Sequence, residues 1–288
     1  MRVATRRHDS DKLAYQKALC ICVANVGGYC TVMTSSPRAE VELQSSMAYW
    51  FPRVADLPVP RTVFVALPVM ASSEWAAEGV PTWYVEQVAR AASFTEYPLF
   101  MRTDYASGKH RWREACYVPD KESLGRHIVT ILEENESDES TGTPYKWPSE
   151  WLVLRDYIPM ETIFEAFSGR MPINHEHRYF IKDGVVQCGH PYWPPAAFKR
   201  EEVGLAPSKL PTDWRARLSA ISLCEHAENQ AVLSTVASRF DGWWSVDFSK
   251  AKSKDWYLID MGRAEISFHW PSCPNAPAEM KERYGEIE

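Results

Sequence analysis

The chain has 288 residues, 45% of them hydrophobic and 24% charged, so it can fold around a sizeable core. Its formal charge of -6 argues against binding to nucleic acid or to an anionic membrane surface. No apolar run approaches the roughly 20 residues that span a bilayer. The basic start, "MRVATRRHDSDKL", also lacks the apolar core of a signal peptide. Together these features predict a cytoplasmic protein.

The cysteines and histidines give no clear metal signature in the sequence. The seven cysteines are odd in number and scattered, without a C-x-x-C pair. Because a disulfide framework or a zinc site would need tighter grouping, we expect reduced and mostly buried thiols. His175 and His177 invite a metal interpretation, but the sequence does not single out a third ligand.

The first half of the chain predicts strands alternating with helices. In the helix at 121–136, Leu124, Ile128 and Leu132 recur at i, i+4 and i+8, which indicates a buried face. The helix at 83–94 should place Trp83, Val85, Val88 and Ala92 near one face. The polar segment at 137–144 is expected to be a mobile loop. The other elements expected here are helical stretches within 11–26, strands at 61–69 and 97–103, and a hairpin partner for the latter at 113–119.

The second half is dominated by predicted strands. The apolar segment "EWLVLRDYI" (150–158) reads as a strand buried on both faces. In "HRYFIKDGVVQCGHPYW" (177–193), Asp183-Gly184 separates two alternating apolar runs and predicts a hairpin. A long helix over about 212–239 precedes two strands at 243–250 and 256–262, and the tail after Pro271 should be peripheral. This order indicates an α+β fold with antiparallel sheets. The sequence contains neither a glycine-rich Rossmann turn nor a GxxxxGK phosphate loop.

Two cations stand close together in "FMRTDYASGKHRW" (100–112). Arg102 lies at the end of a predicted strand, whereas Lys109 lies in a Ser-Gly-Lys-His turn that should be flexible. A rigid planar fork and a mobile point charge from one hairpin suit a polyphosphate. The alternative is that both are surface cations near Asp104 and Glu114.

The segment "HEHRYFIKDG" places charged groups on one face of a strand. Alternation puts Glu176, Arg178 and Phe180 on one face, and His177 and Tyr179 on the other. Glu176 could form a plain ion pair with Arg178, or it could orient Arg178 towards a bound anion. The sequence leaves both possibilities open.

Asp247 in "SVDF" and Asp260 in "YLIDM" each follow an apolar strand run. If the strands are neighbours, both carboxylates reach the same end of a sheet, where a cation between them would offset their repulsion. Mg²⁺ takes one or two carboxylates together with phosphate oxygens, which matches this pair. The alternative is two strand-end aspartates in solvent. In "VLRDYIPME", a strand exit offers backbone groups to the edge of a planar ligand, unless it is an ordinary strand end.

In this order, the segments resemble the ATP-grasp superfamily over roughly residues 55–270. The resemblance is closest to a compact branch found in phage and bacterial genomes, which is distantly like the eukaryotic cell-division-cycle ATP-grasp proteins. Arg102 stands where many members have lysine, and Gly262 stands where the usual second metal ligand is asparagine. The segments that carry the resemblance are "LPVPRTVFV", "PLFMRTDYASGKHRW", "WLVLRDYIPME", "EHRYFIKDG" and "SVDF…WYLIDMG".

The resemblance implies a fold in which two α+β subdomains with antiparallel sheets hold the nucleotide between them, preceded by a smaller N-terminal domain. The expected boundaries are 1–95 for the N-terminal region, 96–270 for the ATP-grasp domain and 271–288 for a tail. The implied activity is an ATP- and Mg²⁺-dependent ligase that joins a carboxylate to an amine or a thiol through an acyl phosphate. The implied partners are a small-molecule or peptide carboxylate and an amine acceptor, without nucleic acid or membrane.

The resemblance also assigns roles to residues. Arg178 and Lys109 would stabilise the phosphoryl group as it transfers, and Asp247 and Asp260 would hold Mg²⁺. Glu161 would take the ribose hydroxyls. The other residues expected to bind the nucleotide, with Lys109 again among them, are Arg102, Arg155, Asp156, Tyr157, Ile158 and Glu176.

Three other functions remain possible from the sequence. The same fold could serve as an ATP-binding assembly or chaperone module without ligase turnover, which the missing asparagine favours. It could also be a phosphotransferase that leaves a stable phosphorylated product. A nucleic-acid ligase would want a basic groove, and the charge of -6 argues against it.

Overall fold

The computed structural model describes residues 37–68, 75, 78–137, 149–204, 208–219 and 226–284. The chain divides into two units, residues 1–40 and 41–288, and the description below concerns the second unit together with the start of its first helix. The helices expected within 11–26 and nearly all of the loop expected at 137–144 lie outside the described residues. Among the described helices, none is both long and apolar enough to cross a membrane.

The first sheet is antiparallel, with the strand order β1-β4-β2-β3. Its central strand, β4, was predicted to be buried on both faces, and Leu152, Val153 and Leu154 are indeed fully buried. The short strand β3 pairs with the start of β2, as the predicted hairpin requires. The strands are β1 (Thr62–Ala66), β2 (Leu99–Thr103), β3 (Tyr117–Val118) and β4 (Trp151–Asp156).

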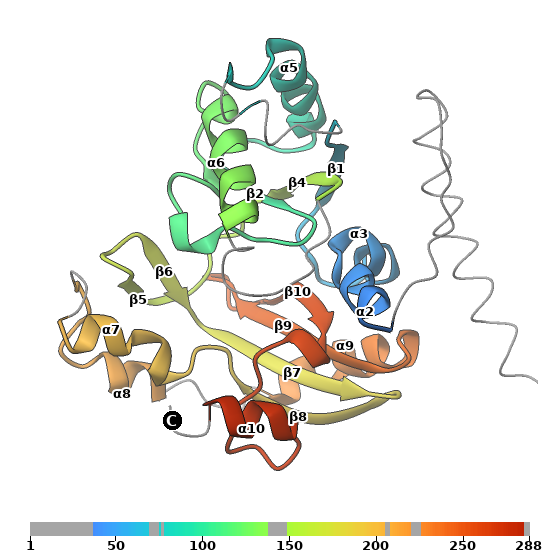
Figure 1. Cartoon of the computed structure of the whole chain (residues 1–288), viewed down its shortest axis with the longest axis vertical. Helices are drawn as coiled ribbons and strands as arrows, with labels where there is room; N and C mark the ends of the chain where they lie inside the picture. Colours follow the sequence, from blue (N-terminus) through green and yellow to red (C-terminus); the bar gives the residue numbers. More distant parts are fainter. Residues whose placement is uncertain are drawn as a thin grey trace, which may run out of the picture. The chain divides into compact units, whose positions relative to one another are not determined.

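Helices α5 (Thr82–Ala91) and α6 (Leu124–Ser137) share the core of the first sheet (Figure 1). The predicted stripe of α6 is confirmed, because Leu124, Ile128 and Leu132 are all buried. The face predicted for α5 is partly wrong, since Trp83 is 55% exposed. Tyr84 begins the buried stripe instead and continues through Val88 to Ala92, the first residue of the short helix η2 (Ala92–Phe94).

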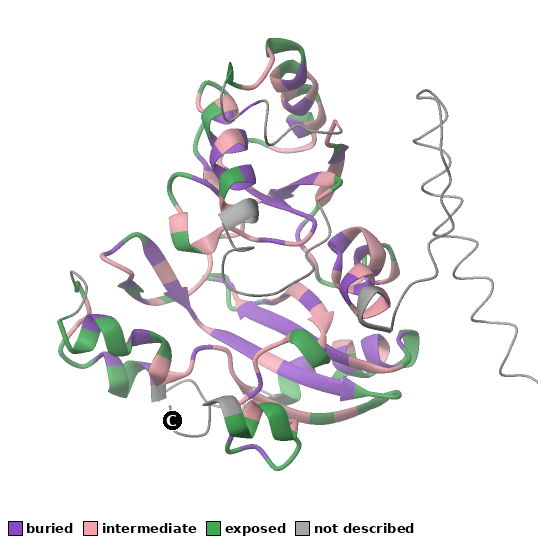
Figure 2. Cartoon of the chain, in the orientation of Figure 1, coloured by how far each residue is buried: buried purple, intermediate pink, exposed green. Residues whose placement is uncertain are grey.

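The second sheet is antiparallel as well, with the strand order β10-β9-β7-β8. The predicted hairpin joins β7 to β8, and its turn residues Asp183 and Gly184 have φ angles of 48° and 82°, the left-handed conformation that Asp and Gly tolerate best. The strands of this sheet are β7 (Glu176–Lys182), β8 (Val185–Pro191), β9 (Trp243–Lys250) and β10 (Trp256–Arg263). Figure 2 shows that β4, β7 and β9 are mostly buried.

The two faces of β7 have different surroundings, as the alternation predicted. Tyr179 points towards α9 (His226–Arg239), where its hydroxyl accepts a hydrogen bond from Asn229. Phe180 lies on the other face, where its ring stacks on His269. The long helix predicted at 212–239 is found as α8 (Trp214–Ser219) and α9, and residues 220–225 between them are not described.

A hairpin of β5 (Thr162–Ala166) and β6 (Met171–Asn174) forms a third, two-stranded sheet. Phe164 and Ile173 of this hairpin pack with Phe198 and Trp214 in a separate core. The elements that remain are α2 (Pro37–Ser45), α3 (Met47–Trp50), η1 (Phe51–Arg53), η3 (Lys109–Arg111), η5 (Pro195–Phe198), α7 (Lys199–Glu202), η7 (Ala264–Ile266) and α10 (Ala278–Tyr284).

The predicted boundaries at residues 95 and 270 stay predictions. Strand β1 and helix α5 precede residue 95, yet they share the sheet and core of β2 and β4. After residue 270, Pro271, Cys273 and Ala276 are buried. The segment expected to be peripheral therefore begins with residues that pack against the rest of the chain.

Candidate active site

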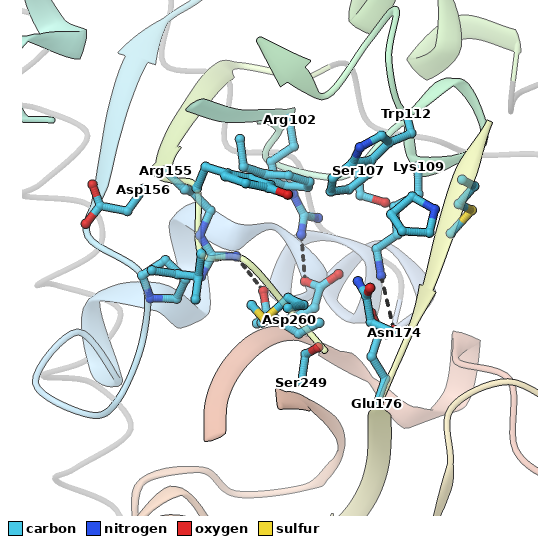
Figure 3. A pocket seen from close by; sticks show the side chains of 18 residues that line it. Arg102, Ser107, Lys109, Trp112, Arg155, Asp156, Asn174, Glu176, Ser249 and Asp260 are labelled. Atoms are coloured by element: carbon cyan, nitrogen blue, oxygen red, sulfur yellow. Dashed lines mark hydrogen bonds and ion pairs between the residues drawn. The ribbon is translucent and has the colours of Figure 1, made fainter. Parts of the chain in front are cut away.

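A cavity of about 650 Å³ is lined by residues of both four-stranded sheets and of the β5–β6 hairpin. Figure 3 shows side chains from opposite sides converging on the cavity. Its lining consists of Pro60, Phe100, Arg102, Ser107, Lys109, Trp112, Arg155, Asp156, Tyr157, Ile158, Met160, Met171, Pro172, Asn174, Glu176, Ser249, Ile259 and Asp260.

One part of the cavity wall is apolar and aromatic. Phe100 and Trp112 lie with their ring centroids 5.7 Å apart, and Trp112 lies 6.4 Å from Tyr157. Ile158 and Met171 add aliphatic surface to the same cavity. Aromatic rings prefer such offset or tilted contacts, and a flat heteroaromatic ligand can extend the arrangement.

The predicted cations Arg102 and Lys109 both face the second sheet. Arg102 is buried, and its Nη1 lies 2.9 Å from Oδ1 of Asp260 on β10. Lys109 Nζ lies 3.8 Å from Oε2 of Glu176 on β7. Figure 3 shows both contacts crossing the cavity. Arg102 and Lys109 therefore each have a carboxylate partner on the second sheet.

The turn that carries Lys109 was predicted to be flexible, and this stays a prediction. Lys109 begins the helix η3, and the preceding Gly108 has a φ of 59°. A Cβ on Gly108 would lie 2.3 Å from Cδ1 of Ile131 in α6 and 3.3 Å from Cβ of Ala115. Because φ is positive and the turn packs closely against α6, glycine is the residue that fits best at this position.

Arg155 is buried and only partly satisfied. Its Nη1 donates to the carbonyl of Ile259 and its Nε to Oγ1 of Thr62, 3.2 Å away. Its Nη2 has no hydrogen-bond partner among the described residues. Burial, with the nearby charge of Arg102, lowers the pKa of Arg155 below its usual value. An anion in the cavity would offset the repulsion between Arg102 and Arg155, and it would accept a hydrogen bond from Nη2 of Arg155.

The two predicted metal-binding aspartates lie directly opposite each other. Asp260 pairs with Asp247 in the β9–β10 register, next to a bulge between Leu258 and Asp260. The expectation that both carboxylates reach the same part of a sheet is therefore confirmed in geometry. They differ in exposure, since Asp247 is buried whereas a quarter of the Asp260 side chain is exposed.

Arg178 is oriented by Asp247, not by Glu176. Its Nε and Nη2 lie 2.7 Å and 2.8 Å from the two carboxylate oxygens of Asp247, and Nη1 donates to the carbonyl of Phe268 at 3.2 Å. The prediction that Glu176 holds Arg178 is wrong, because the β7–β9 register places Asp247 directly beside Arg178. Glu176 instead accepts from Asn174 Nδ2 at 3.5 Å and pairs with Lys109.

The charges of the site are strongly coupled. Burial would lower the pKa of Lys109, but Glu176, Tyr192 and the two aspartates raise it above its usual value. Burial also opposes ionisation of Asp260, yet Arg102 and Lys109 hold its pKa below the usual range. The pKa of Glu176 is raised, mainly by burial. Lys109 and Asp260 are thus charged at neutral pH.

The site residues fit one magnesium ion better at Asp260 than at Asp247. The contacts of Asp260 with Arg102 and with the Met261 amide both use Oδ1 and do not involve Oδ2. Both oxygens of Asp247 are engaged by Arg178. Oε2 of the buried Glu176 makes no hydrogen bond among the described residues, but it lies 3.8 Å from Nζ of Lys109, so a metal ion would share it with that lysine. Carboxylate oxygens of this kind are the ligands that Mg²⁺ prefers.

Most of the predicted site residues meet at the cavity. Arg178 lies on β7, two residues after the lining residue Glu176, and Asp247 on β9 is its partner in the register. Both therefore lie beside the cavity. Asp156 is at the rim, where it pairs with Arg61 at 2.7 Å. Glu161 does not line the cavity and pairs with Lys254 at 2.9 Å. The predicted residues that line the cavity are Arg102, Lys109, Arg155, Asp156, Tyr157, Ile158, Glu176 and Asp260.

Several lining residues were missed in the sequence. Asn174 stands two positions before Glu176, and Ser249 two positions after Asp247, so strand alternation alone could have placed them on the same face. Trp112 follows Lys109 by one helical turn. Met171 and Ile259 carry no signal in the sequence, because ordinary apolar residues line cores and cavities alike.

The comparisons with known proteins agree with this geometry. A family model described as an ATP-grasp domain of the R2K clade, family 3, matches residues 89–278. The chain belongs to this family. The resemblance inferred from the ordered segments is therefore confirmed, and with it the α+β ATP-grasp fold.

Among solved structures, the ATP-grasp chain is similar to Cdc123 from Schizosaccharomyces pombe. The identity is 13%, the match covers 85% of this chain and 92% of that chain, and the TM-score is 0.50. A C-terminally truncated form of the same yeast protein gives 11% identity, coverages of 90% and 95%, and a TM-score of 0.52. At such identities the likeness shows the fold alone. Among curated proteins, no sequence matches this chain.

Proposed function

We propose that this ATP-grasp protein is an ATP- and Mg²⁺-dependent ligase that joins a carboxylate to an amine, with ADP and phosphate as products. One observation carries the proposal: an aromatic slot and a cluster of cations share a single cavity. Four cations gather in and beside this cavity, namely Arg102, Lys109, Arg155 and Arg178, together with four carboxylates, namely Asp156, Glu176, Asp247 and Asp260. Buried arginines and a lysine that share one cavity are suited to a polyphosphate.

The binding half of the proposal follows from the cavity walls. The adenine ring would lie against Phe100, Trp112 and Tyr157, beside the backbone that leaves β4 at Ile158. Nη2 of the lining residue Arg155, which has no hydrogen-bond partner among the described residues, would donate to a bound phosphate. Glu161 stays a candidate for the ribose only if its contact with Lys254 opens.

The catalytic half rests on Arg178 and Lys109. The guanidinium of Arg178 lies 4.5 Å from the ring centroid of Tyr192, and Lys109 Nζ lies 4.9 Å from the same ring. Both cations are thus held beside one aromatic face, and Asp247 fixes the plane of the arginine fork. Donors held in advance where negative charge develops are the largest single source of catalysis in such reactions.

Magnesium, when bound, would neutralise charge on the phosphates as one of them transfers. Asp260 would hold the ion, and Asp247 would keep Arg178 in its orientation. The residues of this chain would otherwise bind, orient and exclude water, since phosphoryl transfer needs positioning more than an enzyme nucleophile.

The proposal is tested by ADP release from the whole chain, with carboxylates and amines supplied singly and together. Lys109→Met should lose about 10²-fold or more in turnover, because one preorganised donor is removed. Lys252→Met is the matched control, since this exposed lysine lies in the β9–β10 turn and does not line the cavity. Equal loss in both variants would contradict the site.

A second candidate is an ATP-binding assembly module without turnover, and Gly262 favours it. A Cβ at Gly262 would contact the hydroxyls of Ser267 at 3.6 Å and Ser245 at 3.8 Å. Gly262 itself has no side chain that could bind a metal, and serine hydroxyls lie near the place where the usual second metal ligand is asparagine. Tight ATP binding with no ADP under any combination of carboxylate and amine would support this candidate. A stable phosphorylated product would indicate a phosphotransferase.

A further inference from the structure

A second group of reactive side chains gathers at the edge strand of the second sheet. Cys188 and His190 lie on β8, and His269 and Cys273 lie in the segment that follows η7. One donor atom from each residue lies within 4.8 Å of the other three. None of the four lines the cavity described above.

The spacing of these donors is close to that of a tetrahedral zinc site. With Zn–S bonds of about 2.3 Å and Zn–N bonds of about 2.0 Å, tetrahedral donors lie roughly 3.3–3.8 Å apart. Sγ of Cys188 is already 3.3 Å from Nε2 of His269. The other donors need to approach by at most about an ångström, which side-chain rotation supplies.

Neighbouring aromatic rings pack against both histidines of the cluster. His269 is fully buried, and its ring stacks on Phe180 with centroids 3.7 Å apart and an angle of 5° between the planes. The ring of His190 lies over Trp270, whose Nε1 donates to the carbonyl of Pro191 at 3.0 Å. Ligand rings fixed by their neighbours in this way are typical of metal sites that contribute to folding.

The polar atoms of the cluster contact one another. Sγ of Cys188 lies 3.3 Å from Nε2 of His269, and the thiols of Cys188 and Cys273 share a hydrogen bond. His269 and Cys273 are buried. Four donors of the kinds that Zn²⁺ prefers therefore converge in a largely buried place.

We propose that Cys188, His190, His269 and Cys273 bind one Zn²⁺ ion tetrahedrally. All four positions are filled by protein, so the site is structural and keeps no place open for a substrate. Each thiol gives its proton to solvent on binding, and the two thiolates then cancel the charge of Zn²⁺. A neutral complex of this kind can be buried at low cost.

The zinc site would also support the proposed active site. The ligand His269 directly follows Phe268, whose carbonyl accepts the hydrogen bond from Nη1 of Arg178. Zinc would join this segment to β8 and so keep that carbonyl in place. Arg178 would then be positioned on one side by Asp247 and on the other by a residue next to a metal ligand.

The test begins with the metal content of the whole chain, purified under reducing conditions and without added chelator. Elemental analysis should give one zinc per chain. Replacement by Co²⁺ should give the visible bands and the thiolate charge-transfer band of a tetrahedral site with two sulfur ligands. Neither readout depends on ATP or on ligase turnover. The zinc site can therefore fail its test while the proposed ligase function stands, and the ligase function can fail while the zinc site stands.

Variants identify the ligands. Cys188→Ser and Cys273→Ser should each lose the zinc, whereas Cys116→Ser should keep it. Cys116 is the matched control, because it is a buried free cysteine outside the cluster. Its thiol donates to the backbone carbonyls of Gly108 and Trp112. If the ligand variants fail to fold, the Co²⁺ spectrum of the unmodified chain still decides.

Three outcomes would overturn the zinc site. The first is wild-type protein with far less than one zinc per chain and no Co²⁺ bands. The second is zinc that is retained in both cysteine variants, which would place the ion elsewhere. The third is a Cys188–Cys273 disulfide found by mass spectrometry in protein protected from oxidation during purification.

Discussion

The two four-stranded sheets contribute to the cavity in opposite ways. The first sheet supplies Arg102 and Arg155, whose partners Asp260 and Ile259 belong to the second sheet. The second sheet supplies carboxylates together with one arginine, and that arginine finds its partner within the same sheet. Arg102 and Arg155 are thus held by partners across the cavity, whereas Arg178 is held by a partner in its own sheet.

This difference separates two kinds of task. A bound phosphate can compete for Arg102 by displacing Asp260, so this contact is exchangeable. The pair of Arg178 with Asp247 is bidentate and internal, so a ligand need not rearrange it. Exchangeable cations suit binding, and a fixed cation suits stabilisation of charge that appears only during reaction.

The largest expected effect comes from removing the carboxylate that faces the first sheet. Asp260→Asn should lower Mg²⁺-dependent turnover by about 10³-fold, because the metal loses a charged ligand and Arg102 loses its partner. ADP release measures the effect, and urea unfolding checks the fold. Asp241→Asn is the control, since this exposed aspartate precedes β9 outside the cavity. Near-normal turnover in folded Asp260→Asn would refute the metal role.

A somewhat smaller effect should follow from altering the internal pair. Arg178→Lys keeps the charge but loses the fork that reaches both oxygens of Asp247, so turnover should fall about 10²-fold. ATP affinity should change little, because Arg102, Lys109 and Arg155 remain. Single-turnover kinetics and nucleotide titration on one preparation separate the two quantities. Arg217→Lys, at the exposed pair with Asp213, is the control.

If ATP affinity of Arg178→Lys collapses while the chemical step at saturation is unchanged, the distinction between ATP-binding cations and a catalytic Arg178 is wrong. Arg178 would then be one more binding cation. The contrast between an exchangeable and a fixed set of cations would lose its functional meaning.

The close approach of the Lys109 turn to α6 predicts a cost in stability. Gly108→Ala should lower the free energy of unfolding by about 2 kcal/mol, because the new Cβ meets Ile131 and the φ angle is positive. Gly204→Ala is matched, since its φ is +74° and nothing lies within 4 Å of the added Cβ. Urea denaturation of both variants isolates the packing contribution. Equal losses would show that the contact with α6 does not hold the turn.

The smallest effect concerns Asp104, at the end of β2. It accepts from Ser46 Oγ at 2.9 Å, and burial raises its pKa to about 6. The folded state therefore binds the proton more tightly than the unfolded state does. Stability from this group is complete below the unfolded pKa of 3.8 and is lost as the pH rises through about 6.

Asp104→Asn should remove this loss and raise the free energy of unfolding by about 1–2 kcal/mol at pH 7.5, with little change at pH 4. The amide can still donate to Ser46 and accept from the Trp151 backbone, which is a further contact of this carboxylate. Urea melts of both proteins at the two pH values give the comparison. An equal difference at both pH values would mean that ionisation of Asp104 is not responsible.

Much of the fold followed from local patterns. The Asp183-Gly184 hairpin, the buried run of β4 and the stripe of α6 each depend on residues close together in the chain, and all three are found. Where the local signal was equivocal, the prediction failed. Trp83 and Tyr84 both fit an amphipathic helix, and only packing against the first sheet decided that Tyr84 is buried.

The site shows the same limit more sharply. Arg102 and Asp260 could be named because strand ends deliver side chains to sheet edges, whereas Arg155 was named only from the family resemblance. The partner of Arg178 could not be predicted, since Glu176 is near in sequence while Asp247 is near only through the β7–β9 register. The sequence could not show that Cys188 and Cys273 lie near each other either, because they meet only in three dimensions.

The sequence by itself determined which chemical groups are present and on which faces of strands and helices they lie. Those properties depend on the period of two in strands, the period of 3.6 in helices and the backbone preferences of glycine, all of which act over a few residues. The tertiary structure decided which cation meets which carboxylate and which cysteine meets which histidine. Such pairings depend on strand register and on packing between distant segments, where burial and charge complementarity act together.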